Sequence, residues 1–205
     1  MAKLDAAFFN HDTLDVAKSL LGTYMVREIN GRLSACRITE TEAYVGRIDK
    51  ACHAYNYKRT KRTETLFAPP GTVYIYLIYG MYHCLNFVTE PENEPCAVLI
   101  RSGEAICGQD DMALARFGKT SAEMSAYQRK NFLNGPGKLC KAFSLSRSEN
   151  GLQLPSESFW LCDNPQDFGV DLPHQPVSPK DIHTSPRVGI NYAEEAVDFP
   201  WRFYL

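Results

Sequence analysis

The pattern of apolar and polar positions predicts a short helix followed by a β-hairpin near the N-terminus. Apolar residues at helical spacing follow Asp12 and Thr13, either of which would cap the helix, and Gly22 would end it. Two β-rich runs then cover residues 23 to 29 and 32 to 44. Asn30-Gly31 between them is a strong signal for a two-residue turn. We therefore expect the first pair of sheet strands here.

A second hairpin is predicted from Thr72–Ile78 and Met81–Thr89, within "TVYIYLIYGMYHCLNF". Gly80 would suit a left-handed turn position, because glycine takes that conformation freely. Tyr79 would then be a bulky aromatic residue at an exposed tip, where small polar residues are usual. Packing does not explain such a residue, so we look for a function for Tyr79.

The rest of the pattern indicates one domain of mixed α and β structure. "CAVLIRSG" is nearly all apolar and predicts a central strand, and "GQDDMALARFG" and "GPGKLCKAFSL" predict helices. Residues 45–71 lack a clean period, which is typical of a long functional loop. No repeat or linker divides the chain. We predict a single α+β domain over residues 1–205, with a curved antiparallel sheet, flanking helices and a protruding hairpin.

Composition adds limits on compartment and partners. The 205 residues are 44% hydrophobic and carry a formal net charge of -2, so nucleic-acid binding would need local basic patches. The 7 cysteines form no CxxC pair and lie mostly in apolar segments, which favours buried free thiols. No run of about 18 uncharged apolar residues occurs. We expect an intracellular monomer without a membrane span, cytoplasmic in a bacterium or nuclear in a eukaryote.

Reactive side chains concentrate in "ITETEAYVGRIDKACHA". On a strand, the period of two places Glu40, Glu42 and Tyr44 on one face. Carboxylates at a strand end are usually solvated, so this segment alone does not distinguish a surface from a catalytic site. Cys52 and His53 do not have metal-ligand spacing to His83 and Cys84, and we expect no metal.

The order of several longer motifs decides between these interpretations. "TEAYVG", "ACHA", "PGTVYIYLIYGMYHCLN", "AVLIR", "NGPGKLC" and "RVG" follow one another here as they do in the 3-methyladenine DNA glycosylases of the alkyladenine type, which this chain resembles from about Leu20 onward. The resemblance implies a monofunctional glycosylase without a cofactor. It would act on double-stranded DNA containing alkylated or deaminated purines and leave an abasic site.

The same resemblance implies a role for individual residues. Glu42 would activate the attacking water, with Arg101 and the backbone carbonyl of Val188 helping to hold it. Tyr79 would fill the gap that an extruded nucleotide leaves in the duplex. The base pocket would be formed by Tyr44, His53, Tyr76 and Asn86, of which Asn86 would exclude guanine by crowding its exocyclic amine. For neutral lesions, His53 or an ordered water is the candidate proton donor.

Local positive charge supplies candidate phosphate contacts. "YKRTKRT" includes Arg62 and lies just after His53, where it favours DNA contact slightly over a solvated loop. By resemblance, Lys138 of "NGPGKLC" and Arg147 fall at positions that contact the DNA backbone. We therefore expect Arg62, Lys138 and Arg147 to bind phosphates.

Two other functions remain open, and two details are unsettled. A non-catalytic module could sense distorted DNA with the same Tyr79 wedge, and a metal-assisted hydrolase could use Glu42, His53, Cys52 and His83. Glu40 could raise the pKa of Glu42 or merely pair with an arginine. The family commonly has Arg-Asn before the Met-Phe that precedes "PGT", where this chain has Arg62-Thr63 and then Leu66-Phe67; we expect that difference to affect the loop and the substrate range, but not the pocket residues.

Overall fold

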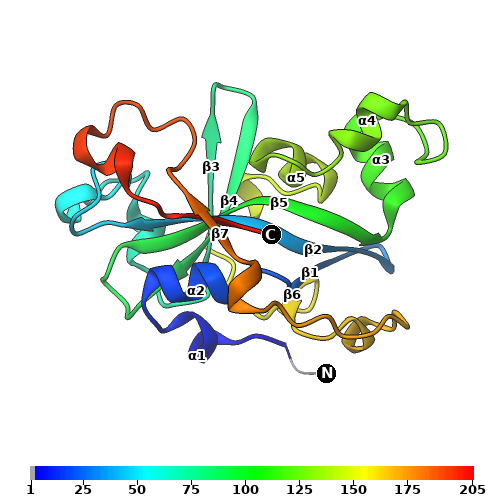
Figure 1. The fold of residues 1–205 in the computed structure, drawn as a ribbon, viewed down its shortest axis with the longest axis horizontal. Coiled ribbons are helices and arrows are strands. Elements are labelled where there is room, and N and C mark those ends of the chain that lie inside the picture. Colours follow the sequence, from blue (N-terminus) through cyan, green and yellow to red (C-terminus); the bar gives the residue numbers. More distant parts are fainter. Residues whose placement is uncertain (1–2) are drawn as a thin grey trace.

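The computed structural model describes residues 3–205, which are built around one antiparallel sheet (Figure 1). Its strand order is β3-β4-β5-β2-β1-β6, and β8 pairs with both β2 and β7. The strands are β1 (Tyr24–Ile29), β2 (Arg32–Val45), β3 (Val73–Ile78), β4 (Tyr82–Thr89), β5 (Cys96–Cys107), β6 (Phe159–Cys162), β7 (His183–Ser185) and β8 (Arg202–Tyr204). The sheet curls into a half-barrel, so the predicted single domain with a curved antiparallel sheet is confirmed.

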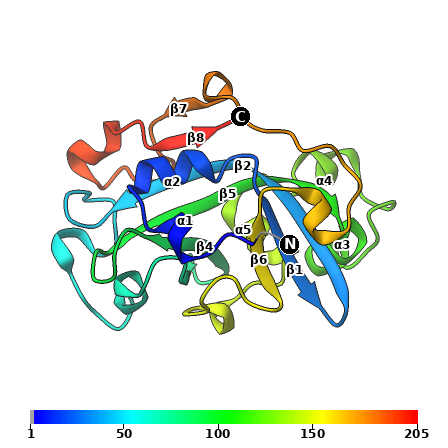
Figure 2. The same ribbon diagram turned by 90° about the horizontal axis from the view of Figure 1, so that it is seen from below.

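Helices cover the sheet from both sides. In Figure 1, α1 and α2 lie below the sheet and α3 to α5 lie above it, and Figure 2 shows α2 crossing the long strands. The α-helices are α1 (Ala6–Phe9), α2 (Thr13–Ser19), α3 (Gln109–Phe117), α4 (Ala126–Lys130) and α5 (Pro136–Ala142). The 3₁₀ turns are η1 (Tyr55–Tyr57), η2 (Glu64–Phe67), η3 (Arg147–Glu149), η4 (Pro165–Phe168), η5 (Pro179–Asp181) and η6 (Glu194–Asp198).

Both predicted hairpins are present. Asn30 and Gly31 take positive φ between the paired Ile29 and Arg32. In the second hairpin, the amide of Met81 donates to the carbonyl of Ile78 at 3.2 Å. Tyr79 and Gly80 stand between them with φ values of 53° and 70°. The β3–β4 hairpin rises at the top of Figure 1, away from α1 and α2.

The other elements follow the sequence pattern with shifted ends. Asp12 caps α2, and "GQDDMALARFG" and "GPGKLCKAFSL" contain α3 and α5. β5 lies between β4 and β2 as expected for a central strand, but it extends to Cys107. The segment 45–71 is not wholly irregular, because η1 and η2 lie within it. Of the 7 free cysteines, only Cys107 is partly exposed. In residues 3–205 no helix is long and apolar enough to cross a membrane.

Candidate active site

A cavity of about 340 Å³ opens between the β3–β4 hairpin and the loops that follow β2 and β7. Strand register builds its floor, because Tyr74, Asn86, Leu99 and Glu42 are directly opposed across β3, β4, β5 and β2. The first three residues of this row line the cavity. Glu42 has no exposed surface, but it contacts three residues that do line the cavity. The pairing of distant strands thus creates the site.

Those three contacts hold both carboxylate oxygens of Glu42. The Tyr44 hydroxyl donates to Oε2 at 2.7 Å, and the Val188 amide donates to Oε1 at 2.8 Å. Arg101 Nη1 forms an ion pair with Oε1 at 3.3 Å. The interaction found for Val188 is therefore made by its N–H, whereas the sequence expectation concerned its carbonyl.

Burial makes Glu42 a stronger base than a solvated glutamate. Loss of solvation raises the pKa of Glu42, and Arg101, the Val188 amide, Tyr44 and Arg187 partly oppose that rise. A buried carboxylate with a raised pKa beside a cavity is typical of a catalytic base.

A β-bulge presents Arg101 to this carboxylate. Ile100 pairs with Thr41 and Ser102 pairs with Glu40, which leaves Arg101 as the extra residue on β5. Bulges beside active sites commonly redirect a side chain. Arg101 Nε donates to Glu40 Oε1 at 3.0 Å, and Arg202 Nε donates to the same oxygen. Glu40 thus does pair with arginines, one of the two roles considered for it.

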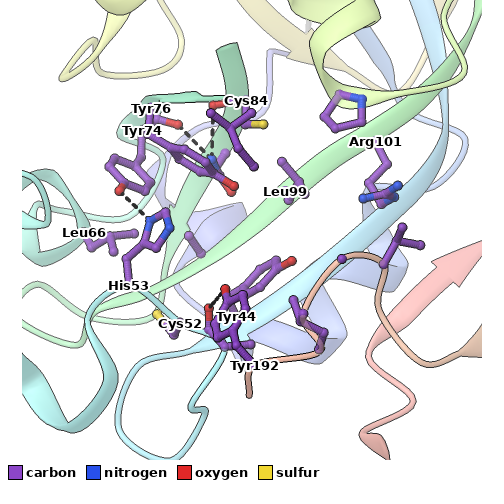
Figure 3. A pocket seen from close by; sticks show the side chains of 18 of the residues that line it. Tyr44, Cys52, His53, Leu66, Tyr74, Tyr76, Cys84, Leu99, Arg101 and Tyr192 are labelled. Carbon is purple, nitrogen blue, oxygen red and sulfur yellow. Dashed lines mark hydrogen bonds between the residues drawn. The ribbon is translucent and has the colours of Figure 1, made fainter. Parts of the chain in front are cut away.

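Aromatic residues form the wall facing Tyr44, as Figure 3 shows. The rings of His53 and Tyr76 lie edge to face with centroids 4.6 Å apart. His53 Nε2 is 3.3 Å from Arg62 Nη2, which can only donate, so Nε2 is the accepting nitrogen and Nδ1–H donates to the Tyr74 hydroxyl at 3.0 Å. Burial, together with the charge of Arg62, lowers the pKa of His53 to about 4. His53 is therefore neutral at neutral pH and supplies no readily released proton.

Behind Tyr44 lies an ion pair that sequence reasoning missed. Arg187 and Asp49 have fully buried side chains and form paired contacts, one of them 2.8 Å long. The Arg187 guanidinium also donates to the carbonyl of Ala43 at 2.7 Å and lies 4.6 Å from the centre of the Tyr44 ring. These contacts anchor the "RVG" segment, and with it the amide of Val188, against β2.

Asn86 is fixed in the cavity floor by its own amide group. Its Nδ2 donates to the carbonyls of Tyr74 at 3.1 Å and Cys84 at 3.3 Å. With both N–H groups occupied, Oδ1 is the polar atom that Asn86 can present to the cavity. At 3% exposure the side chain has little freedom to move away from a bound base.

Tyr79 marks the mouth of the cavity. Its side chain is 79% exposed, and Tyr79 and Ile78 line the opening together with Pro136 at the start of α5. Gly137 lets α5 approach the hairpin, because a Cβ there would come within 2.9 Å of Tyr82 Cβ. The hairpin is thus braced at Tyr82, next to the turn, while the Tyr79 side chain is exposed.

The three expected phosphate-binding cations have different surroundings. Arg62 lies beside His53, with its guanidinium 5.8 Å from the centre of the Tyr76 ring. Lys138 donates to Asn131 at 3.0 Å and to Asn134 at 2.8 Å. Arg147 is exposed in η3 and has no side-chain hydrogen bond or ion pair to residues 3–205. None of the three belongs to the cavity lining, but Arg62 contacts two residues that do, His53 and Tyr76.

The cavity lining includes Leu66, which the sequence does not predict as a pocket residue. Leu66 lines the cavity at 2% exposure, so one of the positions at which this chain departs from the family pattern belongs to the cavity lining. No three His, Cys, Asp or Glu side chains in residues 3–205 gather as a metal-binding group.

Comparisons with known proteins agree on the family. The methylpurine-DNA glycosylase family model matches residues 7–205. A protein of Clostridium perfringens strain 13 named "Putative 3-methyladenine DNA glycosylase" is 49% identical over 207 residues, covering 99% of this chain and 95% of that protein. Proteins with the same name from Alkaliphilus oremlandii and Clostridioides difficile are 45% and 44% identical, covering 99% and 98% of this chain and 95% and 100% of their own lengths.

Proposed function

We propose that this chain, which belongs to the methylpurine-DNA glycosylase family, flips an alkylated or deaminated purine out of duplex DNA and hydrolyses its N-glycosidic bond with water activated by Glu42. Family membership makes it a DNA glycosylase, a hydrolase of N-glycosyl bonds in base excision repair, and removes the non-catalytic alternative. The observation that carries the mechanism is the buried Glu42 carboxylate, held by Val188 and Arg101 beside an aromatic cavity.

The exposed hairpin supports the extrusion step. A base inside a duplex is unreachable until it is unstacked, and side chains inserted between bases help to offset that cost of a few kcal/mol. Tyr79 is 79% exposed next to the mouth of the cavity, so its ring is free to enter a duplex. The base that leaves the stack would then have a cavity within reach.

The aromatic walls support binding of the extruded base. Stacking on an aromatic side chain stabilises a bound base by roughly 1 to 3 kcal/mol. Tyr44 lies across the cavity from Tyr76 and His53, and the cavity volume of about 340 Å³ falls within the range of small-molecule sites. We propose that a purine is held between these walls, with Asn86 beneath it.

The chemistry then needs one base. A methylated purine carries a positive charge and leaves as a neutral molecule, so a second carboxylic acid is not required. Glu42 would accept a proton from the attacking water, and the Val188 amide and Arg101 would hold the carboxylate in place.

Neutral lesions need a different source of leaving-group assistance. His53 has a pKa of about 4 and both of its nitrogens are engaged, so it is a poor proton donor at neutral pH. We therefore assign His53 to the pocket wall. An ordered water would have to protonate a leaving hypoxanthine.

The test is a panel of duplexes that each contain one lesion: 3-methyladenine, 7-methylguanine, hypoxanthine or ethenoadenine. We expect release of free base from at least one duplex, undiminished by a chelator. We also expect no adduct when borohydride is added, because a water nucleophile forms no Schiff base. Release that stops with the chelator, or a borohydride-trapped adduct, would contradict the proposed mechanism.

A further inference from the structure

Glu40 is a charged residue that the mechanism above leaves unused, although it shares Arg101 with the proposed base. Its Oε1 accepts from Arg101 Nε at 3.0 Å and also from Arg202 Nε. The side chains of Arg101 and Glu40 are 14% and 16% exposed, so both are shielded from water. Arg202 in turn donates to Ser185 Oγ at 3.1 Å, which ties the cluster to β7.

Two carboxylates therefore compete for one guanidinium. Arg101 makes its hydrogen bond to Glu40, whereas its contact with Glu42 is a longer ion pair of 3.3 Å. A guanidinium beside a single carboxylate normally closes onto it with two parallel hydrogen bonds. Here the bond to Glu40 turns that edge of Arg101 away from Glu42.

The division of contacts matters for the capacity of Glu42 to accept a proton. A carboxylate has about four acceptor positions. The Val188 amide and the Tyr44 hydroxyl occupy one position each, and Arg101 approaches Oε1 without a hydrogen bond. A bidentate Arg101 would occupy two positions and leave none for a water.

We propose that Glu40 is a positioning residue that takes the hydrogen bond of Arg101 and so keeps this guanidinium from closing onto Glu42. The proposal rests on the proposed function, because it assumes that Glu42 is the base. Glu40 does not touch the substrate. It acts through Arg101, and its effect is to keep Glu42 a strong base with a free acceptor position.

The charged and titratable groups around Glu42 set the expected pH effect. They are Glu40 and Tyr44 on β2, Arg101 on β5, Tyr76 on β3, Cys84 on β4, Arg202 on β8, and Arg187 behind Tyr44. Glu40→Gln removes a negative charge and lets Arg101 approach Glu42. Both changes favour the ionised form of Glu42 and lower its pKa. The acid limb of the rate profile should therefore move to lower pH.

The experiment measures single-turnover base release by the full chain, on the duplex that wild type processes fastest. Glu40→Gln should slow release about tenfold on the high-pH plateau, because a weaker base with fewer free positions accepts the proton less well. Duplex affinity should be unchanged. Glu149→Gln is the matched control: its side chain is 13% exposed and pairs with Arg27 at 2.9 Å in another part of the fold. It should keep the wild-type rate and profile.

A double-mutant cycle shows whether Glu40 acts through Arg101. In an Arg101→Met background, Glu40→Gln should cause no further loss. An equal loss in both backgrounds, or an acid limb that stays in place, would overturn the proposal. Glu40→Asp keeps the charge on a shorter side chain and should give an intermediate rate. If Glu40→Gln does not fold, the same cycle is run with Glu40→Asp. An active Glu42→Gln enzyme would overturn the proposed function itself. If Glu42→Gln is inactive but Glu40→Gln has the wild-type rate, only the positioning role of Glu40 is overturned.

Discussion

The carboxylate cluster and the hairpin tip are opposite kinds of functional region. Glu42 is polar yet has no exposed surface, and Tyr79 is aromatic yet 79% exposed. The cluster is stabilised by contacts from β2, β5 and the Val188 segment. The tip lies in a turn in which Tyr79, a non-glycine residue, takes a φ of 53°. Each region therefore holds a side chain in an environment that it does not favour, a carboxylate away from water and an aromatic ring exposed to water.

This difference indicates when each region acts. A buried polar group is costly unless its partners are already in place, so the cluster is organised before DNA arrives. An exposed aromatic ring gains its stabilisation only when a partner covers it. We therefore expect substitutions in the cluster to affect the chemical step, and substitutions at the tip to affect DNA binding.

The largest expected effect is that of Glu42→Gln. The variant keeps the size of the side chain but removes the base, and general-base assistance is typically worth roughly 100 to 10,000-fold. Single-turnover base release should fall by about that factor while lesion-duplex affinity survives or tightens. Because burial raises the pKa of Glu42, wild-type activity should decline on acidification at a higher pH than a solvated glutamate would give.

Glu149→Gln serves again as the control for a changed Arg-paired glutamate and should leave the rate unaltered. Base release by Glu42→Gln at close to the wild-type rate would show that Glu42 is not the general base. A large loss of duplex affinity in Glu42→Gln would contradict the expectation that the carboxylate cluster affects the chemical step and the hairpin tip affects DNA binding.

Tyr79→Ala should have the next largest effect, and on binding. Losing one aromatic stacking partner costs roughly 1 to 3 kcal/mol, or about 5 to 150-fold in affinity. Folding should be intact because the ring is exposed. Tyr127→Ala in α4 is a control of similar exposure, 75%, and is not part of the cavity lining. Affinity is measured by titration of a lesion duplex; a Tyr79→Ala chain that unfolds would show that the ring has a packing role.

The tip was more predictable from sequence than the cluster. Tyr79-Gly80 between two strand-like runs is local information, and so are the Asn30-Gly31 turn and the Asp12 cap. The predicted pocket includes Tyr76 but not Tyr74, although the period of two places both tyrosines on one face and both line the cavity.

The cluster depends on contacts between residues far apart in the chain. Asp49 and Arg187 are 138 residues apart, and Glu40 and Arg101 are 61 apart. Neither pairing leaves a local pattern, because strand order and register bring these residues together. The bulge that makes Arg101 an extra residue on β5 is likewise a property of the paired strands. Only the resemblance to a family could point to Glu42 and Arg101 in advance.

Asn86→Ala tests a residue that belongs to neither region. We expect release of normal guanine to rise about tenfold, since a small steric block in a pocket typically discriminates by 10-fold or more. Release of an alkylated adenine should change less, because that base has no amine at the same position. Base release from undamaged and lesion duplexes is compared in one assay. Unchanged guanine release would locate the discrimination elsewhere in the cavity.

Substitution of a residue that binds phosphate should have the smallest effect. Arg147 is the candidate to test, because it has no side-chain hydrogen bond or ion pair among residues 3–205, whereas Lys138 is hydrogen-bonded. Arg147 is exposed without a side-chain hydrogen bond or ion pair to residues 3–205, so Arg147→Gln should lower the slope of log affinity against log salt by about 0.9. The loss should be the same for lesion and undamaged duplexes, because phosphates carry no lesion information. Lys18→Gln on α2, across the sheet from the hairpin in Figure 1, should leave the slope unchanged. If Arg147→Gln instead weakened only lesion binding, Arg147 would belong with the hairpin tip, and the separation of lesion recognition from general DNA attraction would fail.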